Sequence, residues 1–149
     1  MLDETGQRLW TLTNFPALDC RSIPSGDIQW SVVLPAISGG FCRLVKQGLL
    51  AVALETGDIQ LHEAATGKLV RRFHSGSAAA QWLVTTADER RLIAAGAEGD
   101  LHIIDPENGV LLASLLLKLP EPIYAVLTPD ERAMAVLAKS GTVSVVPLR

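Results

Sequence analysis

The segment "GDLHIIDPENG" (residues 99–109) places His102 within a few residues of three acidic side chains, Asp100, Asp105 and Glu107. Imidazole and carboxylate groups are the usual ligands of zinc and iron, and carboxylates also bind calcium. A zinc or iron site needs three or four groups that converge on one point. A calcium loop needs its glycine at the sixth position, whereas the glycine that follows Asp105 falls at the fifth. The spacing therefore favours a turn over a metal site.

Other catalytic motifs are equally weak in this sequence. The segment "ATGKL" (residues 65–69) contains a Gly-Lys pair, but it lacks the earlier glycine and the following Ser or Thr of a phosphate-binding loop. The chain also lacks the G-x-S-x-G pattern of a nucleophile elbow. We therefore predict a protein that is not an enzyme and has no catalytic residue, metal ligand or bound cofactor.

Composition narrows the classes of partner and compartment. The chain has 13 basic and 16 acidic residues, a net charge of −3, so the clustered positive charge that binds nucleic acid or anionic membranes is not expected. Cys20 and Cys42 lie far apart, outside any C-x-x-C arrangement, which indicates neither a disulfide framework nor a zinc site. They are expected to be small buried residues, and a single bridge between them is the alternative. An acidic start and the lack of a long apolar run predict a soluble, cytoplasmic protein.

The most informative pattern is an internal repeat. Gly57, Gly99 and Gly141 follow one another at intervals of 42 residues, and Gly67 and Gly109 keep the same interval. A fixed period of this length is typical of repeat architectures, in which each copy is one supersecondary unit. These five glycines are therefore predicted to be structural turns.

The repeat also explains the histidine of the first segment. Gln60 and Ser144 stand at the places in the other copies that correspond to His102. They are the polar members of short runs in which apolar and polar residues alternate, as in "DIQLH" and "TVSV". Such alternation, bounded by Gly, Asp, Asn and Pro, predicts antiparallel strands joined by hairpins. His102 is accordingly expected to be a strand residue.

Four short strands per 42 residues make the unit length of a propeller blade. The turns "AATGK" and "DPENG" look like the D-x-x-T-G turn of quinoprotein-type β-propellers, and "TADER" and "TPDER" look like the first hairpin of WD-repeat blades. "TGQRLW" and "SGDIQW" match the G-x-x-x-W pattern of a docking tryptophan. The chain thus resembles the β-propeller superfamily over roughly residues 39–149, without the Gly-His and Trp-Asp pairs of WD repeats.

The resemblance implies an all-β chain, a partial β-propeller of four-stranded antiparallel blades within one structural domain. "SGG" (residues 38–40) is expected to be a flexible connector, and "TNFPALDCRSIPSG" a loop with room for a short strand. The predicted units are an incomplete N-terminal blade over residues 1–38 with strands near 6–13 and 26–34, blades over 39–80 and 81–122, and an incomplete C-terminal blade over 123–149.

About 3.5 repeat units are too few for a closed propeller, which needs 4 to 8 blades. We therefore expect completion by oligomerisation, as a homodimer, or by a protein partner in a heteromeric assembly, and a non-catalytic role as a protein-interaction or scaffold module. An excised fragment with no function of its own is a third possibility. The predicted contact residues at the two ends of the chain are Val143, Val145, Leu9, Trp10 and Leu12.

The alternative function is a subunit of an enzyme or of a cofactor-binding, quinoprotein-like propeller. In such a protein the site lies on the axis of the ring and needs many converging polar groups. This alternative predicts a polar cluster drawn from the early strands of the units, with Arg43, Gln81 and Tyr124 as its members.

Overall fold

The chain is all-β, as predicted. The computed structural model describes residues 1–149 except residues 14, 77–78, 97, 118–121 and 149. Every regular element in the described residues is a β-strand, and the strands form four antiparallel sheets of three or four strands each. In this described part, no helix is long and apolar enough to cross a membrane.

The four sheets follow one another along the chain, and we number them I to IV. Sheet I consists of β1 (Arg8–Thr13), β2 (Ala17–Ser22) and β3 (Ile28–Val33). Sheet II consists of β4 (Ile37–Leu44), β5 (Leu49–Leu54), β6 (Asp58–Glu63) and β7 (Leu69–His74). Sheet III consists of β8 (Ala80–Thr85), β9 (Leu92–Gly96), β10 (Asp100–Ile104) and β11 (Leu111–Leu116). Sheet IV consists of β12 (Pro122–Leu127), β13 (Ala133–Ala138) and β14 (Val143–Pro147).

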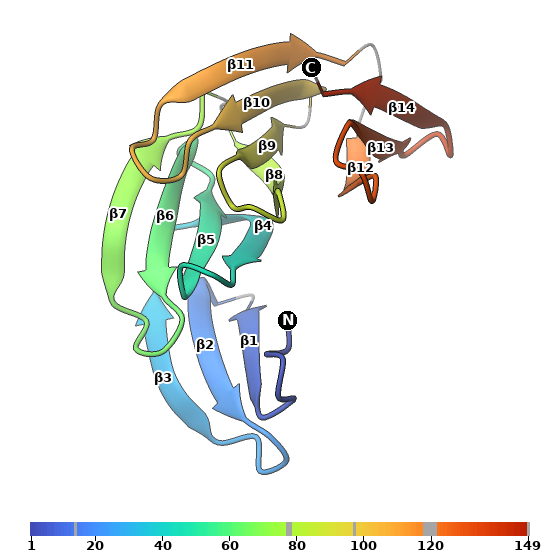
Figure 1. The fold of residues 1–149 in the computed structure, drawn as a ribbon. Coiled ribbons are helices and arrows are strands. Elements are labelled where there is room, and N and C mark those ends of the chain that lie inside the picture. Colours follow the sequence, from blue (N-terminus) through green and yellow to red (C-terminus); the bar gives the residue numbers. More distant parts are fainter. Residues whose placement is uncertain (14, 77–78, 97, 118–121, 149) are drawn as a thin grey trace.

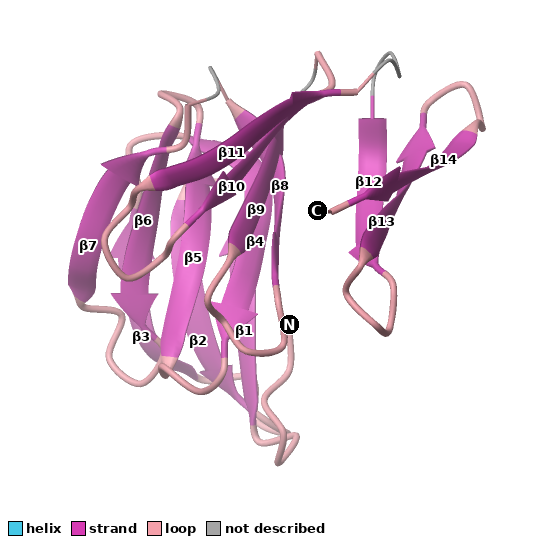
Figure 2. Cartoon of the chain, turned by 45° about the horizontal axis from the view of Figure 1, so that its top comes forward, coloured by secondary structure: helices cyan, strands magenta, loops and turns pink. Residues whose placement is uncertain are grey.

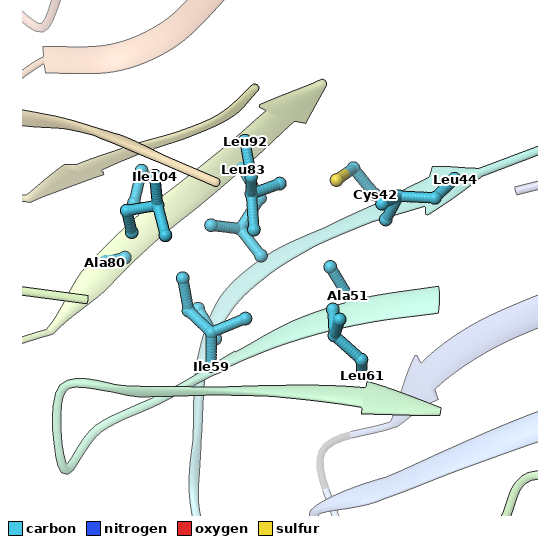
Figure 3. Packing of buried hydrophobic residues seen from close by; sticks show 11 residues of the cluster. Cys42, Leu44, Ala51, Ile59, Leu61, Ala80, Leu83, Leu92 and Ile104 are labelled. Carbon is cyan, nitrogen blue, oxygen red and sulfur yellow. The ribbon is translucent and has the colours of Figure 1, made fainter. Parts of the chain in front are cut away.

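The sheets pack face to face in series along an open arc, with sheet I at one end and sheet IV at the other (Figure 1). One apolar cluster joins sheets I and II, a second joins sheets II and III, and a third joins sheets III and IV. Figure 3 shows the second cluster, in which Ile59 and Leu61 of β6 lie near Leu83 and Leu92 of sheet III. Each inner sheet is therefore covered on both faces, whereas sheets I and IV are each covered on one face only.

The order of strands within a sheet runs from the inside of the arc to the outside. β4 and β8 lie on the inner side of sheets II and III, and β7 and β11 lie on the outer side (Figure 1). Sheet I matches the last three strands of this order and sheet IV the first three (Figure 2). In sheet I, Leu2 forms an isolated bridge with Leu9, so the first residues of the chain lie along the inner edge of β1.

The repeated glycines lie in turns and have positive φ angles, which glycine adopts at little cost. Gly67 and Gly109 have a second role, because a Cβ atom at Gly67 would lie 2.6 Å from the Trp30 ring, and one at Gly109 would lie 2.7 Å from the Cβ of Phe73. In sheets I and II, the outermost strand thus packs an aromatic side chain against a glycine of the following sheet. This contact gives a physical reason for the 42-residue interval between the two glycines.

Two parts of the N-terminal half differ from the sequence prediction. The segment predicted to be a loop with room for a short strand contains β2, which is the central strand of sheet I. The predicted connector at residues 38–40 lies inside β4, so that prediction was wrong. A Cβ atom at Gly40 would lie 2.6 Å from the Cα of Trp82, so glycine here allows the backbones of β4 and β8 to approach closely.

Candidate functional site

The outward face of sheet IV is an exposed apolar surface, which we call the C-end face. Its large side chains are well exposed, with Val143 at 62%, Val145 at 67% and Tyr124 at 62% of their full accessibility. The alternate residues of the same strands, such as Met134 and Val136, are buried against sheet III. The C-end face consists of Tyr124, Val126, Ala133, Ala135, Leu137, Val143, Val145 and Pro147.

The repeat shows what covers this face elsewhere in the chain. Val143 and Val145 correspond to Leu101 and Ile103 of sheet III, which are 0% and 5% exposed because sheet IV packs on them. In sheet II, the residues at the same positions of the repeat are Ile59 and Leu61, and both are fully buried under sheet III. The C-end face therefore corresponds to the face of each inner sheet that is covered by the next sheet of the series.

The outward face of sheet I, which we call the N-end face, has a polar centre. Asp19 of β2 accepts a hydrogen bond from the Ser31 hydroxyl at 2.7 Å, and the Arg21 guanidinium donates to the same carboxylate at 3.1 Å. Asp19 is 5% exposed, whereas the Arg21 side chain that pairs with it is 36% exposed. The N-end face consists of Leu9, Thr11, Thr13, Ala17, Asp19, Arg21 and Ser31, and Val33 lies at its outer rim.

The same polar arrangement occurs on an inner sheet. His102 of β10 lies opposite Ser114 of β11, with His102 Nδ1 2.8 Å from Ser114 Oγ, just as Asp19 lies opposite Ser31. In sheet III this pair lies on the face turned toward sheet II, and His102 is buried. Sheets I and III thus share a polar cross-strand pair on the face that points toward the start of the series.

The five predicted contact residues lie on three different surfaces. Val143 and Val145 share the C-end face, and Leu9 lies half-buried on the N-end face. Trp10 and Leu12 point the other way, into the cluster between sheets I and II. The Trp10 indole Nε1 donates to the Ala64 carbonyl oxygen at 3.0 Å, and the ring is 1% exposed. Trp10 therefore holds sheet I to sheet II.

The acidic residues and the histidine of the first segment serve the local fold. His102 Nε2 lies 3.3 Å from Asp100 Oδ2, so both ring nitrogens of His102 have partners within the sheet. Asp105 accepts hydrogen bonds from the backbone N–H of Glu107 and the side-chain amide of Asn108, as acidic residues do in turns. Among the described residues, no three His, Cys, Asp or Glu side chains are placed to hold a metal ion.

The repeated Asp-Glu-Arg turn joins neighbouring sheets through its glutamate. Glu89 has a φ of 61° and its buried carboxylate accepts the backbone N–H groups of Lys46 at 2.7 Å and Gln47 at 3.1 Å. Next to it, the Thr86 hydroxyl and then the Arg90 backbone N–H hold the pKa of Asp88 below its ordinary value. The turn thus ties sheet III to the first hairpin of sheet II.

The copy of this turn in sheet IV repeats the arrangement. Glu131 has a φ of 55°, and its carboxylate accepts the backbone N–H of Ala87 in sheet III. The Thr128 hydroxyl and the Arg132 backbone N–H lower the pKa of Asp130 in the same way. The sequence repeat of Asp-Glu-Arg was visible, but its role as a link between sheets was not predicted.

An open depression of about 620 Å³ lies beside these turns. Three of its charged residues already have partners: Glu89 holds two amides, Arg71 donates to the Pro106 carbonyl oxygen at 2.8 Å, and Asp105 caps its own turn. These three groups stabilise loops, whereas small-molecule sites use polar groups that converge on the ligand.

The residues of the cofactor-site alternative are not grouped around one point by any contact in the described structure. Arg43 pairs with Glu4 at 2.9 Å and lies 4.6 Å from the centre of the Trp10 ring. Gln81 is exposed on β8, and Tyr124 belongs to the C-end face.

Known proteins give no further guidance on this arrangement. No protein-family model matches the chain, and no curated protein matches it significantly.

The sequence prediction missed Tyr124, Val126 and Leu137 of the C-end face and the Asp19–Ser31 pair of the N-end face. A signal for the first group was present, because Tyr124 and Val126 follow Trp82 and Val84 at the 42-residue interval and the latter two pack between sheets III and IV. For Asp19 the signal was weak, because its strand was assigned to a loop.

Proposed function

We propose that this protein is a non-catalytic interaction module, built from propeller blades of the WD-repeat or quinoprotein type, that assembles with itself or with another chain. The C-end face carries this proposal. Its residues have the same positions in the repeat as residues that are buried between sheets, yet Val143 and Val145 are about two-thirds exposed. A contiguous exposed apolar surface of this kind usually marks an interaction site.

The edges of the terminal sheets support the same function. β14 is an edge strand at the place where sheets II and III continue with a fourth strand. Exposed edges and apolar faces favour pairing with another polypeptide, and propellers avoid this by closing the ring. Association would satisfy the edge and bury the face together.

A cytoplasmic location is part of the proposal. Cys20 and Cys42 are both buried free thiols, which suits a reducing compartment.

The test is a measurement of mass in solution by sedimentation equilibrium. We expect the wild-type chain, alone or with its partner, to be larger than one chain, and Val145→Lys to lower the mass because a charge on the C-end face cannot be buried without cost. Leu116→Lys is the matched control, since Leu116 is 75% exposed on β11 and lies on neither end face. A mass unchanged by Val145→Lys would remove the C-end face as the interaction surface.

A further inference from the structure

We propose that the occupant of the C-end face is the N-end face of a second copy of this chain, so that two copies close into one ring. The inference rests on the proposed function and names its partner and its contact. Each chain contributes four sheets, and the pair therefore contains eight, which is within the range of closed propellers.

The contact between copies would repeat a contact that the chain already makes three times. Sheets I and II, II and III, and III and IV each meet in the same manner, with the later sheet covering the outward face of the earlier one. The series leaves one face of each kind unused, the C-end face of sheet IV and the N-end face of sheet I. A surface and its complement on the same chain produce a head-to-tail contact between copies.

On the N-end face, Leu9 has the position in the repeat that this contact between sheets buries elsewhere. Leu9 of β1 occupies the place in sheet I that Leu50 of β5 and Leu92 of β9 occupy in sheets II and III. Leu50 and Leu92 are both 0% exposed, because the preceding sheet covers them. Leu9 is half-buried in the single chain, and a sheet packed on the N-end face would cover the remainder.

The charges of the N-end face are already paired, which allows an apolar surface to cover them. Arg21 and Asp19 neutralise each other, and Ser31 satisfies the second carboxylate oxygen. Burying a charge without a partner is costly, whereas a hydrogen-bonded pair can be covered. The buried His102–Ser114 pair of sheet III shows the same solution beneath sheet II.

The outer rim of the face provides an internal control. Val33 is the last residue of β3, and His74 and Leu116 are the last residues of β7 and β11. Val33 is 84% exposed and Leu116 75%, and the His74 side chain is 61% exposed, even though His74 and Leu116 belong to inner sheets. The contact between sheets does not reach this rim, so a substitution at Val33 should leave the contact between copies intact.

The experiment uses sedimentation velocity on the full chain and three variants: Leu9→Lys, which alters the N-end face; Val145→Lys, which alters the C-end face; and Val33→Lys, the rim control. We expect the wild type and Val33→Lys to sediment as two chains, and each of the other variants to sediment as one chain with at least a tenfold weaker association. Mixed in equal amounts, Leu9→Lys and Val145→Lys should form a pair of chains again, because one unaltered contact remains between them.

The recovery in the mixture also shows that both variants are folded, which a loss of association alone would not. A two-chain wild type whose mass responds to Val145→Lys but not to Leu9→Lys would overturn the inference in favour of two C-end faces packed together. A two-chain wild type that neither substitution affects would overturn the inference while leaving self-assembly in place. If the wild type stays a single chain, the inference is overturned. If, in addition, Val145→Lys leaves the binding of this protein to every other protein chain unchanged, the proposed function fails as well.

Discussion

Sheet I and sheet IV end the same series, yet their outward faces differ in chemistry. The N-end face has an ion pair at its centre, in which the buried Asp19 is held by the partly exposed Arg21 and by Ser31. The C-end face has Val143 and Val145 at the corresponding strands and no charged residue among those that form it. Sheet III shows the same contrast within the series, because it turns the His102–Ser114 pair toward sheet II and the apolar Leu101 and Ile103 toward sheet IV.

The two end faces are both exposed because no further sheet covers them in the single chain, but they gain unequally from being covered. Asp19, Arg21 and Ser31 on the N-end face satisfy one another and can face water at little cost. The C-end face exposes aliphatic side chains whose counterparts in sheets II and III are buried. Apolar burial is worth roughly 25 cal/mol for each Å² removed from water, so the C-end face has the larger free energy to gain from association.

The largest change in unfolding free energy is expected at a position of the repeat that is buried in an inner sheet and exposed on the C-end face. Leu101→Ala should lower the free energy of unfolding by about 2–5 kcal/mol, because it leaves a cavity between sheets III and IV. Val143→Ala, at the matching position, should change it by less than about 0.5 kcal/mol in the dissociated chain. Urea unfolding of dilute protein measures both. Equal losses would mean that the C-end face is covered within the single chain.

The next effect compares the two ends directly. Asp19→Ala should cost about 1–3 kcal/mol of unfolding free energy, because Arg21 and Ser31 lose their buried acceptor. Ser144 has the matching position in sheet IV and is only half-buried, so Ser144→Ala should cost less than about 0.5 kcal/mol. Thermal unfolding of the two variants distinguishes them. A loss for Ser144→Ala as large as that for Asp19→Ala would contradict the polar role assigned to the N-end face.

A smaller effect concerns the repeated turn, which is the same in an inner sheet and in an end sheet. The Thr86 and Thr128 hydroxyls lower the pKa of Asp88 and Asp130 below the ordinary value of 3.8. Because the folded-state pKa is depressed, the stabilisation is present above pH 3.8 and is lost as the pH falls through the folded-state value.

Asp88→Asn and Asp130→Asn should therefore each reduce the loss of stability between neutral pH and about pH 3, measured by urea unfolding at both pH values. We expect the two variants to behave alike, since both turns make the same hydrogen bonds. A change in the acid dependence for only one of them would show that the end sheet is held differently from the inner one.

The smallest effect uses the two thiols as reporters of the contacts between sheets, with Cys20 between sheets I and II and Cys42 between sheets II and III. Burial raises the pKa of Cys42 to about 12 and also raises the pKa of Cys20, so little reactive thiolate exists at neutral pH. A thiol reagent should label neither residue in the native protein and both in urea. Rapid labelling of Cys20 alone would mean that sheet I separates from sheet II under native conditions.

Several features of the fold could be predicted from particular residues. Gly57, Gly99 and Gly141 predicted the hairpins, because a regular interval of turn residues requires a repeated unit. Alternation in "DIQLH" predicted a strand with two different faces. Gly40 was missed, because the close approach of β4 and β8 that requires glycine depends on a contact with a residue far along the chain.

The candidate site was only partly predictable for a related reason. A period of two residues shows that Leu9 and Trp10 point to opposite faces of β1, but it does not show which of these faces another sheet covers. That depends on the order of the sheets in space, which places Trp10 against Ala64 and leaves Leu9 on the outside. Asp19 was missed because its strand contains no turn glycine that belongs to the 42-residue series.

The mass of the wild-type chain in dilute solution shows whether the two end faces bind each other. If the N-end and C-end faces are complementary halves of one contact, sedimentation equilibrium at micromolar concentration should give twice the 15.9 kDa of the single chain, with dissociation only on strong dilution. A mass of 15.9 kDa at every concentration at which the protein is soluble would contradict the claim, and so would a mass that grows beyond two chains without limit.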